Sequence, residues 1–203
     1  MATKKPIAPA CERNREPILD VLRTVFADVD KVLEIGSGTG QHAVFFAEHL
    51  PYLQWQCTEL AENLAGIRAW IADSGLTNLP PPWPLDIATA DLGQQLFPAI
   101  FSANTVHIIR WPLVEKLFAL VGRQLQPGGI FCLYGPFNYD GQFTSQSNAD
   151  FDQWLKQRDA QSGIRDVTAV DRLAVAQGLQ LCDDIAMPAN NRMLVWCKPK
   201  NQG

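Results

Sequence analysis

The sequence contains no run of basic residues, no long apolar segment and no pair of cysteines at a metal-binding spacing. Contacts with phosphates dominate the affinity of proteins for nucleic acids, so a formal net charge of −4 without a basic cluster argues against such a partner. No apolar run approaches the roughly 20 residues that span a bilayer, which argues against a membrane protein. Residues 1–6 also lack the apolar core of a signal peptide, and we therefore expect a cytoplasmic protein.

The five cysteines and three histidines are widely scattered along the chain. No two cysteines form a C-x-x-C pair, and most lie in apolar segments that resemble strands. The histidines have no ligand-like partners at close spacing. We therefore expect reduced cysteines in the core, as in a cytoplasmic protein, and no bound metal.

The length and composition predict one globular domain. The chain has 203 residues, of which 47% are apolar and 19% are charged, enough for a complete core. Helical and strand-like patterns alternate until two final strands, 179–185 and 193–198, which a short turn joins. Such an alternation is typical of an α/β domain with a mainly parallel sheet, and the tight turn requires an antiparallel last strand.

The most informative stretch is 31–40, which reads Lys-Val-Leu-Glu-Ile-Gly-Ser-Gly-Thr-Gly. An apolar run that ends in an acid meets three glycines at alternate positions, and residues 41–50 carry apolar side chains at helical spacing. The pattern predicts a strand, a tight turn and a helix. Glycine permits positive φ and lets a ligand approach the backbone, while the helix start offers free N–H groups. The sequence therefore predicts a ligand site here, and a structural turn without a ligand is the alternative.

The spacing of the glycines distinguishes between known ligand-binding loops. The dinucleotide fingerprint has its third glycine at the position of Gln41, and a P-loop ends in a lysine that is absent here. The stretch instead resembles the first motif of class I S-adenosylmethionine-dependent methyltransferases. That resemblance implies that loop N–H groups bind the cofactor carboxylate, while Glu34 serves the ammonium group through space or water. The implied loop residues are Gly36, Ser37, Gly38 and Gly40.

Acids also end the next predicted strands. Glu59 follows Gly40 by close to the roughly 20 residues at which nucleotide-binding α/β folds place an acid on the ribose hydroxyls. A carboxylate can accept both hydroxyl protons, although Glu59 could instead cap the helix that follows. In a fold of this kind, Asp86 can reach the adenine amino group, with Ile87 against the adenine ring.

Polar residues follow the predicted strand that begins at Phe97. Asn104, Thr105 and His107 lie at its carboxyl end, the edge at which open α/β sheets bind ligands. We expect Asn104 and Thr105 to contact the cofactor. His107, or Tyr134 on the next strand, is an optional general base, and a purely structural histidine is the alternative.

Two further segments are expected to cover the site. A helix is predicted to begin near Pro17, preceded by Arg13 and Asn14, which either fold over the ligand or stay solvated. In the first case, residues 1–28 pack over the cofactor. The glycine-containing segment 134–147 is expected to close over the acceptor side.

Several segments resemble one small family. They are 11–18, 38–43, 133–137, 163–166 and 187–191. The family is methyltransferase-like, has long been labelled a domain of unknown function, and is related to methyltransferase-like protein 26. The resemblance runs over nearly the whole chain and implies a single domain, 1–203, with the class I methyltransferase (Rossmann-like) fold. Its mostly parallel seven-stranded sheet has an antiparallel C-terminal hairpin.

The resemblance implies S-adenosylmethionine as the cofactor and S-adenosylhomocysteine as its product, but not an acceptor. The chain lacks the Asn/Asp-Pro-Pro-aromatic stretch of many amino-group methylases. The leading hypothesis is therefore a methyltransferase that acts on a small molecule, with much of the catalysis supplied by positioning. The alternatives are a binding module without turnover and an NAD-dependent oxidoreductase, which Gln41 at the third glycine position disfavours.

Overall fold

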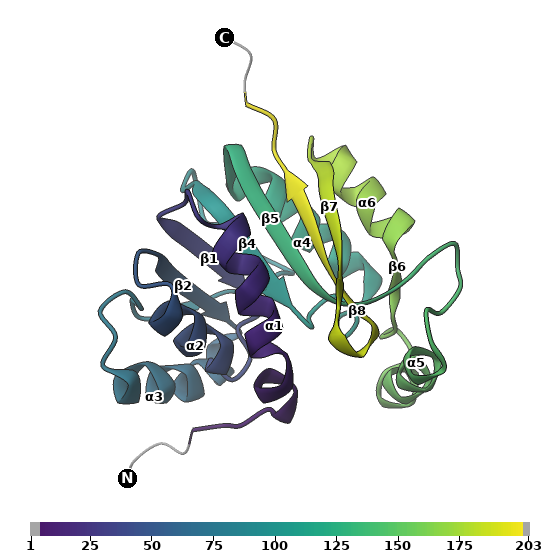
Figure 1. Ribbon diagram of the computed structural model, residues 1–203, viewed down its shortest axis with the longest axis horizontal. Coiled ribbons are helices and arrows are strands. Elements are labelled where there is room, and N and C mark those ends of the chain that lie inside the picture. The colour runs from purple at the N-terminus through teal and green to yellow at the C-terminus, as the bar shows by residue number, and fades with distance from the viewer. Residues whose placement is uncertain (1–4, 201–203) are drawn as a thin grey trace.

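The computed structural model describes residues 5–200, and its centre is a single sheet flanked by helices (Figure 1). The strands lie in the order β3-β2-β1-β4-β5-β8-β7, and the short β6 pairs with the end of β5. Strand pairs from β3 to β5 are parallel, whereas β8 is antiparallel to β5 and β7. The predicted α/β fold with an antiparallel C-terminal hairpin is therefore confirmed. The strands are β1 Lys31–Ile35, β2 Gln54–Glu59, β3 Trp83–Pro84, β4 Phe97–Ala103, β5 Leu125–Asn138, β6 Arg165–Asp166, β7 Gln180–Met187 and β8 Asn191–Cys197.

Helices cover both faces of the sheet. The first three helices pack on one face and α4 and α6 on the other, while α5 lies near β6 (Figure 1). The helices are α1 Pro9–Val25, α2 Gln41–His49, α3 Leu64–Ser74, α4 Trp111–Gln124, α5 Gln146–Arg158 and α6 Val167–Ala176, with the 3-10 turns η1 Ala61–Asn63 and η2 Pro188–Asn190. Among residues 5–200, no helix combines the length and apolar character needed to span a bilayer.

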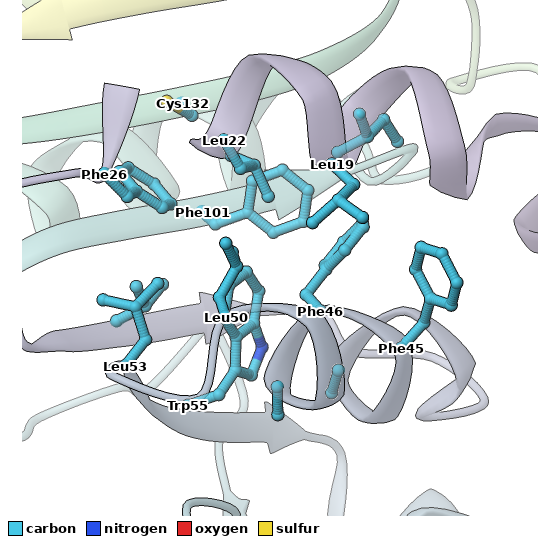
Figure 2. Close-up of a cluster of buried hydrophobic side chains, with 14 of the residues drawn as sticks. Leu19, Leu22, Phe26, Phe45, Phe46, Leu50, Leu53, Trp55, Phe101 and Cys132 are labelled. Carbon is cyan, nitrogen blue, oxygen red and sulfur yellow. The ribbon is translucent and has the colours of Figure 1, made fainter. Parts of the chain in front are cut away.

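The strands feed two separate cores because successive side chains point to opposite faces of a sheet. Figure 2 shows the core between the sheet, α1 and α2. There the rings of Phe46, Trp55 and Phe101 lie with their centroids 5.3 to 5.7 Å apart. Burial of each such side chain contributes about 1.5–3 kcal/mol. This packed core thus fixes the positions of β1 and α2, and with them the turn that joins the two.

Helix α1 begins earlier than the sequence predicts. Ala8 is its N-cap and Pro9 its first residue, so Pro17 lies inside the helix and not in its first turn. A proline there removes one backbone hydrogen bond, and burial of Ile18, Leu19 and Leu22 against the core offsets that loss. Arg13 and Asn14 consequently lie within α1 and do not precede it.

The prediction of five reduced cysteines is wrong for one pair. Cys182 on β7 and Cys197 on β8 form a disulfide, with their Cα atoms 6.0 Å apart. Adjacent antiparallel strands bring residues that are distant in sequence to this separation, which no local pattern reveals. Cys57 and Cys132 are free and buried, as expected, and Cys11 is free and half-buried.

Candidate functional site

A cavity of about 470 Å³ opens at the carboxyl ends of β1, β2 and β4. This is the edge at which open α/β sheets bind ligands. Its wall is formed by the start of α1, the β1–α2 turn and the segments that follow β2, β3 and β4. The lining residues are Ala8, Ala10, Cys11, Gly36, Ser37, Gly38, Thr39, His42, Glu59, Leu60, Leu85, Asp86, Ile87, Ala103, Asn104, Thr105, Ile108, Ile109 and Leu113.

The three glycines of the β1–α2 turn differ in the space that a Cβ atom would have at each position. Gly36 has φ +76°, and a Cβ there would lie 2.8 Å from Oγ1 of Thr105, so this position needs glycine for close approach. Gly38 has φ +56°, and a Cβ there would meet no atom within 4 Å. A Cβ on Gly40, the N-cap of α2, would press on Ile67 of α3 at 3.2 Å. Only Gly38 therefore leaves open space in front of its backbone.

Most N–H groups of this turn already have partners. Ser37 donates to the Thr58 carbonyl at 2.9 Å, Gly38 to the Glu59 carboxylate at 2.8 Å, and Gly40 to the Ser37 carbonyl at 2.9 Å. The turn therefore offers a ligand carboxylate fewer donors than the sequence implies. The Gln41 N–H donates to Oγ1 of Thr39 at 3.4 Å, so the N–H groups of His42 and Ala43 are the remaining donors at the start of α2.

Glu34 is buried beneath the turn and does not line the cavity. Its Oε2 accepts from Oγ of Ser37 at 2.7 Å and from Nε1 of Trp55 at 3.1 Å. Burial disfavours the charged form and raises the pKa of Glu34 to about 7, although both hydrogen bonds oppose the rise. The structure thus gives Glu34 a direct role in holding Ser37, and any influence of Glu34 on an ammonium group in the cavity would act through space or water, as predicted.

Glu59 lines the cavity, and its carboxylate also accepts hydrogen bonds from the residues that follow it. Its Oε2 accepts the Gly38 N–H, and its Oε1 accepts the Leu60 N–H at 2.9 Å and Nδ2 of Asn63 at 3.3 Å. A carboxylate has about four acceptor positions, so one remains for a ligand hydroxyl. Both interpretations of Glu59, ligand contact and cap, are therefore compatible with its geometry.

Asp86 and Ile87 lie in the segment that follows β3, where the cavity wall is largely apolar. Oδ1 of Asp86 accepts the Ala88 N–H at 2.8 Å, which fixes the carboxylate. Leu85, Ile108, Ile109 and Leu113 complete this part of the lining. A flat apolar ring with one polar edge is the ligand group that matches such a wall.

His107 lies within the turn that follows β4, and its side chain is buried. Asn104 begins this turn with φ +56°, and its N–H donates to the Tyr134 carbonyl at 2.9 Å. His107 is 2% exposed, packs edge-on against Phe151, and its Nδ1 has no partner among the described residues. A Cβ on Gly135 would lie 3.4 Å from that nitrogen and 4.0 Å from Oδ1 of Asn104. Burial lowers the pKa of His107 to about 4, and the nearby charge of Arg165 acts in the same direction.

The segment 162–165 holds this turn through four consecutive carbonyl groups. Arg165 donates from Nε to the Val106 carbonyl at 3.0 Å and from Nη2 to the Ile109 carbonyl at 2.6 Å. The Gly163 N–H donates to the His107 carbonyl at 2.9 Å, and Oγ of Ser162 to the Ile108 carbonyl at 2.6 Å. A part of the chain that lies outside the cavity therefore shapes its wall.

Helix α1 is fastened to the glycine turn by the two residues that begin α2. Gln41 accepts the Ala8 N–H at 2.6 Å and donates to Glu12 at 2.7 Å. Nε2 of His42 lies 2.7 Å from Oδ1 of Asn14. In the sequence, Gln41 is notable only because it occupies the position of the third glycine of the dinucleotide fingerprint. In the structure, its side chain joins α1 to α2.

The cavity brings together many of the predicted cofactor residues but neither proposed base. In its lining are Gly36, Ser37, Gly38, Glu59, Asp86, Ile87, Asn104 and Thr105. Outside it are Arg13, Asn14, Glu34, Gly40, His107 and Tyr134. Arg13 is exposed on α1, and Tyr134 is buried in the core beside Asn14. No residue of 134–147, the predicted cover, contributes to the lining.

Thr39 and His42 are polar lining residues that the sequence interpretation missed. Thr39 lies within the glycine turn and His42 two residues after it, and this nearness is the local signal that could have identified them. The start of α1 was missed as well, because the helix was expected to begin near Pro17.

A family model, described as "Protein of unknown function (DUF938)", matches residues 5–198. The chain belongs to this family. The DUF938 model covers all strands and helices of the structure, so the glycine turn, the cavity and α1 lie within the matched region.

This DUF938 chain is similar in fold to solved methyltransferase structures. An O-methyltransferase family protein from Burkholderia thailandensis matches with a TM-score of 0.84 and 16% identity, over 95% of this chain and 58% of that one. A family 2 O-methyltransferase from Planctomyces limnophilus, in complex with apigenin, has a TM-score of 0.81 and 14% identity over 93% and 57%. Human N-acetylserotonin methyltransferase in complex with SAM has a TM-score of 0.71 and 13% identity over 92% and 55%. The chain therefore has the methyltransferase fold and spans little more than half the length of these proteins.

Proposed function

We propose that this protein transfers a methyl group from S-adenosylmethionine to a small-molecule acceptor. The observation that carries the proposal is that Gly38 and Glu59 face one cavity at the carboxyl ends of β1 and β2. The open space in front of Gly38 would be filled by any side chain, so the turn is suited to a ligand that approaches its backbone. The residues present fit a cofactor with an adenine, a ribose and an amino-acid group.

Each part of the cofactor has a matching set of residues. Glu59 would accept from a ribose hydroxyl, and Asp86 from the adenine amino group, with Ile87 against the ring. Asn104 and Thr105 would contact the cofactor from the β4 side, and Ser37, held by Glu34, from the turn. Arg13, on the exposed side of α1, has the weakest support of these predicted contacts.

His107, the optional base, would take a proton from a hydroxyl acceptor only if the turn after β4 moved to expose its ring. When bound, the cofactor supplies an electrophilic methyl group on a sulfonium. The neutral ring of His107 has Nδ1 unpartnered beside Gly135, but this nitrogen is buried outside the cavity lining and would receive the proton only of an acceptor hydroxyl that reached it. Because its pKa is low, His107 would take the proton late, and most of the rate would come from positioning. Burial raises the pKa of Tyr134, which supports a role as a donor and not as a base.

Three finer points belong to this proposal. A small-molecule acceptor is supported by the similar structures, one of which contains apigenin and another of which is an N-acetylserotonin methyltransferase. A cytoplasmic location is supported by the lack of a long apolar segment in the sequence and by the free Cys57 and Cys132, whereas the Cys182–Cys197 disulfide is unusual for that compartment. The relation to methyltransferase-like protein 26 rests on the sequence segments alone.

Calorimetry with S-adenosylhomocysteine tests the proposal directly. We expect binding of one molecule per chain, and mass spectrometry of ligand that copurifies with the protein is an independent check. Binding of NAD in place of S-adenosylhomocysteine would overturn the assignment. Binding of the cofactor without methyl transfer to any of a panel of phenols, amines and thiols would favour the binding module.

A further inference from the structure

We infer that His42 binds the α-ammonium group of the cofactor through its ring nitrogen Nδ1, in the place that the sequence suggests for Glu34. This inference rests on the proposed function and adds a residue that the sequence motif does not identify. It starts from the position of the ring. His42 is the second residue of α2, lines the cavity, and is 5% exposed. Its ring stacks on Phe46, with centroids 5.2 Å apart and planes inclined by 16°, so its orientation is fixed.

The hydrogen bond to Asn14 determines which nitrogen of His42 carries the proton. Oδ1 of Asn14, 2.7 Å from Nε2, is an amide oxygen and can only accept, so Nε2 must donate. Burial holds the ring neutral by lowering the pKa of His42 to about 4, with the charge of Arg15 acting in the same direction. A neutral ring has one N–H, which leaves Nδ1 as a bare acceptor.

Nδ1 of His42 remains available to a ligand. It has no hydrogen-bond partner among residues 5–200 and, unlike Nδ1 of His107, it is not fully buried.

Among residues 5–200, no acidic side chain lies where it could bind an ammonium group at this end of the cavity. Glu59 and Asp86 are the acids of the lining, and they lie at the end of β2 and in the segment that follows β3. Glu34 is below the turn, with Oε2 committed to Ser37 and Trp55. The cofactor carboxylate fits the free N–H groups at the start of α2, and its ammonium group is attached to the same carbon. The bare Nδ1 of His42 is the acceptor beside that position.

The test compares two ligands that differ in the amino-acid portion, which carries the ammonium group that His42 would bind. S-Adenosylhomocysteine has the amino-acid portion, and 5′-methylthioadenosine has the same nucleoside without it. We expect His42→Phe, which keeps the stacking on Phe46, to raise the Kd for S-adenosylhomocysteine at least tenfold in calorimetry. The Kd for 5′-methylthioadenosine should stay within twofold of the parent value. His49→Phe is the matched control, because His49 lies on the same helix, bonds the Phe45 carbonyl and does not line the cavity.

Two further variants keep the test decisive. His42→Lys places a positive charge beside the ammonium group and should disfavour S-adenosylhomocysteine more strongly than His42→Phe does. His42→Gln has a polar side chain and is measured in the same way if the phenylalanine variant does not fold. Equal losses for both ligands, or no loss for either, would overturn the inference while leaving the proposed function intact. A parent protein that binds neither ligand would overturn the proposed function itself.

Discussion

The backbone N–H of Gly38 donates to Oε2 of Glu59 across 2.8 Å, and this bond joins the turn after β1 to the end of β2. Both residues line the cavity, so the bond fixes a carboxylate at the position where the two strands end. The same carboxylate caps the Leu60 N–H through Oε1. Removing the Glu59 carboxylate would therefore remove both the cap and the proposed ligand contact.

Replacing Glu59 should weaken cofactor binding more than it weakens the fold. A hydrogen bond to a charged group contributes about 1.5–3 kcal/mol, so Glu59→Ala should raise the Kd for S-adenosylhomocysteine roughly tenfold or more in calorimetry. Glu62→Ala is the control, because Glu62 is exposed on η1 and does not line the cavity. Unchanged affinity in Glu59→Ala would mean that Glu59 is only a cap.

Gly38 and Gly75 form a matched pair for testing the open space in the turn. Both have positive φ, +56° and +66°, and a Cβ on either would meet no atom within 4 Å. An alanine should cost each site on the order of 1–3 kcal/mol of folding free energy through backbone strain. Gly38 faces the cavity, whereas Gly75 is the C-cap of α3. Gly38→Ala should therefore lose S-adenosylhomocysteine binding, while Gly75→Ala should keep it at a similar melting temperature. Equal binding by the two variants would remove the turn from the site.

Local patterns predict the central elements well, since the strand, the glycine turn and α2 each follow from neighbouring residues. Residues that depend on distant contacts escape this reasoning. The start of α1 was misplaced because Pro17 is tolerated only through burial of the residues after it. The contacts of Gln41 with Ala8 and of His42 with Asn14 bridge two helices. Nothing in the sequence near Cys182 indicates that it pairs with Cys197.

Arg165 should support cofactor binding without touching the cofactor. It donates to the Val106 and Ile109 carbonyls, and the turn between them presents Ile108 and Ile109 to the cavity. Arg165→Ala should weaken S-adenosylhomocysteine several-fold and increase amide hydrogen exchange within 106–110. Lysine has a single nitrogen that cannot reproduce the fork, so Arg165→Lys should recover only part of both effects. Arg158→Ala is the control, because Arg158 lies on α5 over the Trp154 ring. Exchange that rises without any change in affinity would show that the turn does not shape the site.

Glu34 should make the stability of the protein fall between mildly acidic and neutral pH. Its folded pKa is raised from 4.5 to about 7, so between these values the folded state holds a proton that the unfolded state has released. The contribution to stability is fully present below pH 4.5 and is lost as the pH rises through about 7. The two pKa values imply a loss on the order of 3 kcal/mol.

The Glu34→Gln variant isolates this effect. Its amide oxygen can accept from Ser37 and Trp55 as Oε2 does, and it carries no charge at any pH. The buried His42 and His107 have lowered pKa values and oppose the trend, because they favour unfolding as the pH falls below 6.5. Those contributions cancel in the difference between parent and variant. Denaturant unfolding at pH 5 and pH 8 should show Glu34→Gln gaining stability relative to the parent as the pH rises. A difference that stays constant across this range would place the folded pKa of Glu34 near its ordinary value, with the carboxylate charged beneath the turn and available to attract a cation above it.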